Sequence, residues 1–117
     1  MTQKAASFPP HLRLREPAEF KCVFANPERS TDKYFTVLAI VNELNHARLG
    51  LAIAKKNIKR AVDRNKIKRS ARESFRLQQQ AMTNIDIVVM ARREASAANS
   101  KTLQASLDKY WLKLIKR

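Results

Sequence analysis

The pattern of apolar and polar positions predicts three helices and three strands. In the helical segments apolar residues recur every three or four positions, as on the buried face of an amphipathic helix; these segments are residues 17–25, 57–80 and 101–116. Runs of β-branched, aromatic and aliphatic residues predict strands at 34–42, 48–54 and 85–92. A weaker strand signal lies at 28–32, and the polar, proline-containing residues 1–12 predict an irregular N-terminal arm.

Individual residues refine these elements. Pro17 suits the first turn of a helix, and Ser100 suits the residue that caps one. The polar turn at 43–47 would let the first two strands pair as a hairpin, whereas the almost wholly apolar third strand is expected to be buried on both faces. The order α-β-β-α-β-α therefore predicts a single α+β domain over residues 1–117, with a small sheet covered by helices.

Charge adds the strongest functional signal. The 117 residues include 24 Lys or Arg against 10 Asp or Glu, a net charge of +14. A folded domain this basic is expected to bind a polyanion, with nucleic acid favoured over an anionic membrane. The charge is concentrated in residues 55–76, where ten Lys or Arg accompany only Asp63 and Glu73.

On a helix, this basic segment has two distinct faces. At 100° per residue, one stripe carries Asn65, Arg69, Arg72 and Arg76, flanked by Lys68. A separate apolar stripe carries Ile67, Ala71 and Phe75. Lining up like charges costs stability unless an anion neutralises them, and guanidinium groups suit phosphate. We therefore expect the helix to dock by its apolar stripe and to bind nucleic acid by its cationic stripe, with a merely solvated helix face as the alternative.

The composition excludes several other classes of protein. Gly50 is the only glycine, so neither a P-loop nor a glycine-rich dinucleotide turn can form. Cys22 is the only cysteine, which excludes a disulfide framework, and we expect it to be a buried thiol. His11 and His46 are far apart, and we expect no metal site. With neither a membrane-length apolar run nor an apolar secretory core at the N-terminus, an intracellular protein is expected.

The second predicted strand has one shallow face. Because side chains alternate along a strand, one face carries the small residues Gly50, Ala52 and Ala54 together with Arg48. A single nucleic-acid strand could lie on such a surface, held by aromatic stacking and positive charge. Phe20 and Phe24 of the first helix are candidates for the stacking, although packing in the protein core is the more ordinary role for them.

Residues 48–76, RLGLAIAKKNIKRAVDRNKIKRSARESFR, resemble the central signature of the bacterial ribonuclease P protein component. That signature is an R-x-G strand, a Lys-Lys pair and the run A-V-x-R-N-R-x-K-R-x-x-R-E-x-F. It is present here as Arg48-Leu49-Gly50, Lys55-Lys56 and residues 61–75, with the family's R-N-R replaced by Arg64-Asn65-Lys66. FPPHLRLREPAEFKCVF at 8–24 and IDIVVMAR at 85–92 are similar to the family's opening and to its later strand.

The resemblance implies a fold and a function. The fold would be a small α-β sandwich with a left-handed β-α-β crossover around helix 57–80, as in a domain of a ribosomal protein. The function would be that of the protein subunit of ribonuclease P, which removes the 5′ leader from precursor tRNA. In that family the catalytic RNA carries the chemistry with Mg²⁺, so no catalytic residue and no protein-bound cofactor or metal is expected. The protein would be a monomer in a one-protein, one-RNA assembly in the bacterial cytoplasm.

The resemblance also assigns two surfaces. The contact with the catalytic RNA falls on the basic segment, at Lys55, Lys56, Arg64, Asn65, Lys66, Lys68, Arg69, Arg72 and Arg76. A cleft for the leader of precursor tRNA lies between the first helix and the sheet, at Phe20, Phe24, Thr36, Leu38, Arg48 and Ala52.

Four other functions are alternatives to this one. The main alternative is a non-catalytic RNA-binding protein or RNA chaperone of ribosome-assembly type, which composition alone does not separate from the first reading. A DNA-binding protein of helical type would be expected to carry a dimerisation element, and the sequence shows none. Binding to a membrane surface would need a helix with a more strongly apolar side than residues 57–80 have. Catalysis by the protein itself is disfavoured because its acids are scattered. Asp86, inside a predicted strand, is expected to form a structural hydrogen bond.

Overall fold

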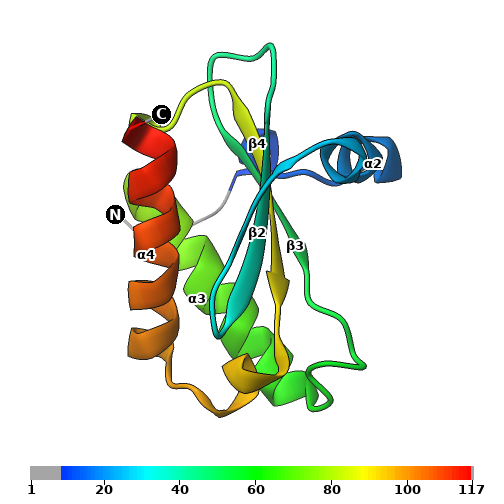
Figure 1. Cartoon of the computed structure of the whole chain (residues 1–117), viewed down its shortest axis with the longest axis vertical. Helices are drawn as coiled ribbons and strands as arrows, with labels where there is room; N and C mark the ends of the chain where they lie inside the picture. Colours follow the sequence, from blue (N-terminus) through cyan, green and yellow to red (C-terminus); the bar gives the residue numbers. More distant parts are fainter. Residues whose placement is uncertain (1–8, 117) are drawn as a thin grey trace.

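The computed structural model describes residues 9–116, in which a four-stranded sheet separates helix α2 from helices α3 and α4 (Figure 1). With η denoting a 3₁₀ helix, the elements in chain order are η1 (Pro10–Leu12), α2 (Pro17–Ala25), β1 (Glu28–Thr31), β2 (Phe35–Val41), β3 (Arg48–Ala52), α3 (Ala61–Gln78), η2 (Gln79–Ala81), β4 (Ile85–Ala91), η3 (Arg93–Ala97) and α4 (Ser100–Lys116). This arrangement confirms the predicted α+β class, and β1 confirms the weak strand signal.

The order of the strands in the sheet is β1-β2-β4-β3. Strand β4 is antiparallel to β2 and parallel to β3, so it separates the two strands that the sequence had suggested as a hairpin. That prediction was wrong. Six of the seven β4 residues are buried, and a strand apolar on both faces is stable at the centre of a sheet, where layers cover both faces.

Helix α3 is shorter than predicted because the chain turns before it. It begins at Ala61 instead of residue 57, and it ends at Gln78 before the 3₁₀ turn η2. Arg60 has an extended backbone, with φ −88° and ψ 133°. Ile58 is completely buried and anchors the preceding turn in the core. The first part of the basic segment therefore lies on a loop and only the rest lies on the helix.

Two smaller corrections concern the ends of the chain. Helix α4 begins at Ser100 itself, and the preceding residue Asn99 supplies the cap, since its side-chain oxygen accepts the Thr102 N–H at 2.8 Å. Of the predicted arm, residues 1–8 lie outside the described part. The end of that arm is not irregular, because it forms η1 and buries Leu12 in the main core.

The two faces of the sheet are covered by cores of different size. The larger core lies under α3 and α4, where the Phe75 and Trp111 rings meet edge to face with centroids 5.8 Å apart. Trp111 Nε1 also donates a hydrogen bond to Ser74 Oγ at 2.7 Å, which fixes the contact between the two helices. The smaller core lies under α2 and comprises Leu14, Val23, Leu38 and Val88. This second, thinner layer positions α2.

Helix α2 touches the sheet by a narrow strip. Pro17 occupies its first turn, as predicted, and Glu16 and Glu19 form a reciprocal capping box. Val23 is completely buried, whereas Cys22 is exposed. The prediction of a buried thiol was wrong because neighbouring helical residues point about 100° apart, so burial of Val23 turns Cys22 away from the sheet.

Candidate nucleic-acid interface

The exposed face of α3 carries the predicted cationic stripe. Asn65, Arg69 and Arg72 are exposed, while the apolar stripe of Ile67, Ala71 and Phe75 is completely buried. Within residues 9–116, neither Lys68 nor Arg69 forms an ion pair. We call Asn65, Lys68, Arg69 and Arg72 the cationic ridge; the helix holds it outward because its opposite side is fixed in the core.

Three other predicted RNA contacts are engaged within the protein. Arg64 Nη1 donates hydrogen bonds to the carbonyl oxygens of Ile58 and Lys59, both at 2.9 Å, and thereby closes the turn before α3. Lys66 Nζ donates to the Ser96 carbonyl at 3.0 Å. The same ammonium lies 4.0 Å from Asp63 Oδ1. A compact ammonium suits these contacts, so the departure from the family's arginine has a local structural use.

The third engaged residue is Arg76, at the end of the predicted stripe. Its guanidinium pairs with Glu73 one turn earlier, and that hydrogen bond raises the pKa of Arg76. The predicted stripe thus has two parts. The cationic ridge points outward, whereas the charge of Arg76 is already partly neutralised by Glu73.

The loop before α3 adds further positive charge. Lys55 and Lys56 are exposed on it. Lys56 also lines a hollow of about 340 Å³ where this loop meets η3; the other lining residues are Asn57, Lys59, Arg60, Asp63, Arg93 and Ser96. The sequence did not single out Arg93, because it lies far along the chain and only the fold brings η3 to the start of α3.

The predicted leader cleft gathers on one face of the sheet. The strand register places Thr36, Met90 and Ala52 in one row, and Leu38, Val88 and Gly50 in the next. Arg48 follows beside Asp86. The sequence prediction that Thr36, Leu38, Arg48 and Ala52 belong together therefore agrees with the register, and α2 lies over this face (Figure 1).

The same face is more filled than its small residues suggested. A Cβ atom placed on Gly50 would lie 2.7 Å from two ring carbons of Phe20, so the ring already occupies the space above the glycine. Thr36 and Leu38 are buried, at 6% and 4% exposure, whereas Phe24 is 46% exposed. The accessible members of the predicted cleft are thus Phe24, which is exposed, and Phe20, Arg48 and Ala52, which are half-buried.

Arg48 is held by two carboxylates. Its Nε and Nη2 donate to the two oxygens of Asp86 at 2.9 and 2.7 Å, and its Nη1 donates to Glu19 Oε2 at 2.9 Å. The hydrogen bonds with Asp86 raise the pKa of Arg48, despite its partial burial. Asp86 also accepts a hydrogen bond from Asn42 Nδ2 at 2.7 Å. The expectation of a structural role for Asp86 is confirmed.

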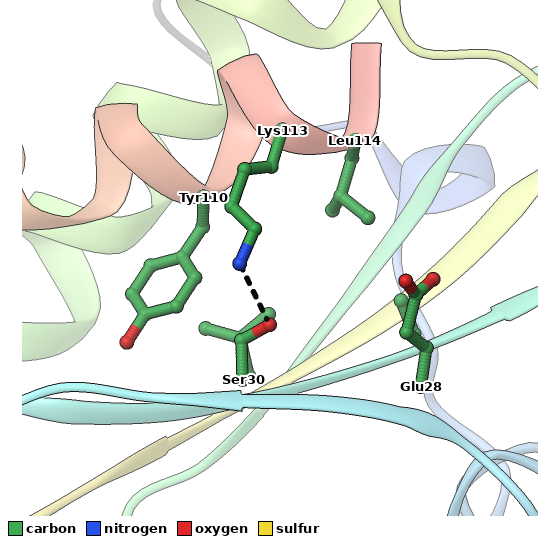
Figure 2. A pocket seen from close by; sticks show the side chains of 7 residues that line it. Glu28, Ser30, Tyr110, Lys113 and Leu114 are labelled. Atoms are coloured by element: carbon green, nitrogen blue, oxygen red, sulfur yellow. Dashed lines mark hydrogen bonds between the residues drawn. The ribbon is translucent and has the colours of Figure 1, made fainter. Parts of the chain in front are cut away.

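The opposite face of the molecule carries a hollow of different chemistry. It lies between β1 and α4, has a volume of about 120 Å³, and is lined in part by Glu28, Tyr110 and Lys113 (Figure 2). Lys113 Nζ reaches Ser30 Oγ at 3.4 Å across its mouth. Because an acid and a base share this hollow, it lacks the single sign of charge that marks the ridge.

Within residues 9–116, no group of three or more His, Cys, Asp or Glu side chains is arranged to hold a metal ion. Among the same residues, no helix is both long enough and apolar enough to cross a membrane. The two histidines have a structural contact, in which His46 Nε2 lies 2.9 Å from the carbonyl oxygen of His11.

Comparisons with known proteins agree on one family. The Ribonuclease P family model matches residues 8–115. The ribonuclease P protein component of Methylococcus capsulatus is 53% identical over 110 residues, covering 94% of this chain and 86% of its own. That of Cronobacter sakazakii is 46% identical over 105 residues, covering 90% and 88%.

Solved structures give the same result at the level of the fold. The RNase P protein of Staphylococcus aureus superposes with a TM-score of 0.80 at 34% identity, covering 90% of this chain and 95% of its own. The RNase P protein of Thermotoga maritima superposes with a TM-score of 0.77 at 30% identity, covering 86% and 96%. The chain therefore belongs to the ribonuclease P protein family, the protein part of a ribonucleoprotein endoribonuclease.

Proposed function

We propose that this chain binds the catalytic RNA of ribonuclease P through the cationic ridge and assists removal of the 5′ leader from precursor tRNA. The observation that carries the proposal is the row formed by Lys68, Arg69 and Arg72, which lies on the outward side of a helix whose other side is buried. Family membership supports RNA as the partner.

Electrostatics explains why the ridge favours a folded RNA. The whole chain carries +14, and the ridge cations have no acid paired with them among the described residues. Their mutual repulsion weakens the free protein slightly and is relieved when phosphates approach. Each phosphate contact also releases condensed counterions from the RNA, which makes binding favourable and dependent on salt.

The chemistry in this proposal belongs to the RNA. We assign Mg²⁺ to the catalytic RNA, and the protein residues supply binding and orientation of the two RNA molecules. One protein pairs with one RNA, in the bacterial cytoplasm. The protein's own acids are used structurally where the fold brings them to the site, as with Asp86 and Glu19 on Arg48.

The leader of precursor tRNA is assigned to the face under α2. Phe24 is exposed and Phe20 is half-buried on Gly50, so their rings can meet an unpaired base without unfolding the smaller core. Stacking of one base on an aromatic ring contributes about 1–3 kcal/mol. Arg48 assists indirectly by holding α2 through Glu19.

Reconstitution tests the function. The protein, a bacterial ribonuclease P RNA and end-labelled precursor tRNA are combined at low Mg²⁺, and leader removal is followed with time. We expect the protein to stimulate cleavage by the RNA and to cleave nothing alone. Binding to many RNAs without stimulation would instead support the chaperone alternative, and cleavage by the protein alone would overturn the assignment of the chemistry.

A substitution separates the leader from the rest of the substrate. Phe20→Leu removes the ring while keeping an apolar side chain, so affinity for precursor tRNA should fall more than affinity for mature tRNA, which has no leader. Cys22→Ala, on the exposed side of the same helix, is the matched control and should change neither affinity. Equal losses for both tRNAs would count against a leader site at Phe20.

A further inference from the structure

A hollow at the outer edge of β3 joins the two surfaces described above. Strand β3 is at one end of the sheet, and the chain before α2 runs beside it, with Leu14 N–H donating to the Leu49 carbonyl at 3.0 Å. Between this segment and α3 lies a space of about 170 Å³, which we call the edge pocket; its lining residues are Arg13, Leu14, Phe20, Leu49, Leu51, Lys68 and Arg72.

The charged residues of the edge pocket are all positive. Arg13 enters from the segment before α2, whereas Lys68 and Arg72 enter from α3, and the lining includes no Asp or Glu. Arg72 is exposed as a whole residue, but partial desolvation of its guanidinium lowers its pKa, and the positive charge of Arg13 lowers it further. The Arg13 and Arg72 charges therefore lie close enough to act on each other, and a phosphate held between them would be attracted by both.

The remaining lining residues sharpen the choice of anion. Leu14, Leu49 and Leu51 supply apolar lining, which lowers the local dielectric constant and strengthens attraction between the cations and a bound anion. Guanidinium groups bind phosphate oxygens through paired N–H donors. The ring of Phe20 forms an adjoining wall on which a base or sugar can rest.

We propose that the edge pocket binds one phosphate group of an RNA backbone, held by Arg13, Lys68 and Arg72, with the neighbouring nucleotide against Phe20. This inference rests on the proposed function, namely that the chain binds RNA. It adds Arg13, which belongs to neither surface assigned from the sequence. The pocket shares Lys68 and Arg72 with the cationic ridge and Phe20 with the face under α2, so one bound phosphate would connect the two.

The first experiment uses inorganic phosphate with the whole protein. The Nε–Hε resonances of Arg13 and Arg72 are followed by NMR as sodium phosphate replaces sodium chloride at constant ionic strength. We expect phosphate-specific, saturable shifts at both arginines. The shift at Arg13 should disappear in Arg72→Gln and persist in Arg69→Gln, a control on the same helix outside the pocket. No specific shift, or an unchanged shift at Arg13 in Arg72→Gln, overturns the pocket.

The second experiment identifies which RNA supplies the phosphate. The salt dependence of binding is measured for Arg13→Gln with the catalytic RNA alone, and with precursor and mature tRNA on the assembled ribonucleoprotein. Loss of one phosphate contact should lower the log–log slope by about 0.7–0.9. A lower slope with the catalytic RNA assigns the phosphate to that RNA, whereas a loss confined to precursor tRNA assigns it to the leader.

The control keeps this inference separate from the proposed function. If Arg13→Gln leaves every slope unchanged while Arg69→Gln lowers the slope for the catalytic RNA, the edge pocket is overturned and the ridge stands. If Arg69→Gln has no effect either, the ridge proposal fails as well. Far-ultraviolet circular dichroism and the melting temperature of each variant establish that the loss is not one of folding.

Discussion

Arg48 and Arg69 are the same amino acid in two opposite settings. Arg48 lies on the face under α2, where its side chain is 19% exposed and is held by Asp86 and Glu19. Arg69 lies on the cationic ridge, exposed and with no ion pair among the described residues. The two carboxylates paired with Arg48 make it a structural residue. Arg69 has no such acid among the described residues and is available to an external anion.

The contrast extends to the neighbours of each residue. Asp86 comes from the central strand and Glu19 from α2, so the pairing of Arg48 links two layers of the fold. The acids of α3 instead pair within their own helix, as Glu73 does with Arg76. Charge is therefore neutralised where it connects layers and left unpaired along the ridge, which is the distribution expected of a surface that meets a polyanion.

The largest effect should follow from breaking the Arg48 cluster. Arg48→Met keeps the aliphatic bulk but leaves the Asp86 carboxylate, only 8% exposed, without its cation. Removal of one partner of a fully buried pair costs about 3–5 kcal/mol, and the partial exposure of Arg48 reduces this to about 2 kcal/mol. We expect a loss of that size in the free energy of unfolding, measured by urea denaturation.

Arg69→Ala is the matched control for that stability measurement. Since Arg69 is exposed and forms no ion pair, its removal should change the free energy of unfolding by no more than about 0.5 kcal/mol. If Arg48→Met and Arg69→Ala prove equally stable, the structural role given to Arg48 is wrong.

The second prediction concerns affinity for RNA, where Arg69 is expected to matter more than an arginine with an internal partner. Arg69→Ala should weaken binding to the catalytic RNA and lower the log–log salt slope by about 0.9, by analogy with duplex DNA. Arg76→Ala should lower it less, because the ion pair with Glu73 already neutralises part of that charge. The slope is obtained from filter-binding titrations at several salt concentrations. A larger effect at Arg76 than at Arg69 would contradict the division of the stripe.

The sequence predicted the ridge well because helical periodicity is a local property. The spacing of Ile67, Ala71 and Phe75 determines which side of α3 is buried, and the cationic stripe follows on another side. Local pattern could not assign partners across the fold. The pairing of β4 between β2 and β3, and of Arg48 with Asp86, depends on contacts between residues far apart along the chain.

Other differences have equally local physical causes. Residues 57–60 have a helical composition, yet burial of Ile58 and the hydrogen bonds from Arg64 to the carbonyls of Ile58 and Lys59 favour a turn. The sequence predicted an open surface on the side of β3 that carries Gly50, because glycine has no side chain to fill the space above it. The sequence does not show that Phe20, thirty positions earlier, fills the space. The sequence thus predicted which side of α3 is cationic and exposed, whereas the ion pairs and packing around it depend on the fold.

The smallest predicted effect concerns Glu19, which connects α2 to the Arg48 cluster. Its carboxylate accepts the backbone N–H groups of Arg15 and Glu16, and these hydrogen bonds, with a smaller contribution from Arg48, lower its pKa below the ordinary value of 4.5. A carboxyl group whose pKa is lower in the folded than in the unfolded state stabilises the fold above the unfolded pKa, and that stabilisation is lost as pH falls through the folded pKa.

Glu19→Gln should therefore be less stable than the wild type near pH 7, and the difference in the free energy of unfolding should shrink as pH falls below the ordinary carboxyl pKa of 4.5. The measurement is urea denaturation at a series of pH values. Asp32 also has a lowered pKa, because hydrogen bonds from Ser106 and from the Phe35 and Tyr34 N–H groups outweigh its burial. Asp32 contributes to the loss of stability at low pH in both proteins, so only the difference between them reports on Glu19.

Glu43→Gln, which removes an exposed loop carboxylate, is the control for charge alone. A constant difference between Glu19→Gln and the wild type across the range would show that Glu19 contributes by shape and not by its charge, and the link from Arg48 to α2 would then have to be carried by packing of Phe20 and Val23 on the sheet.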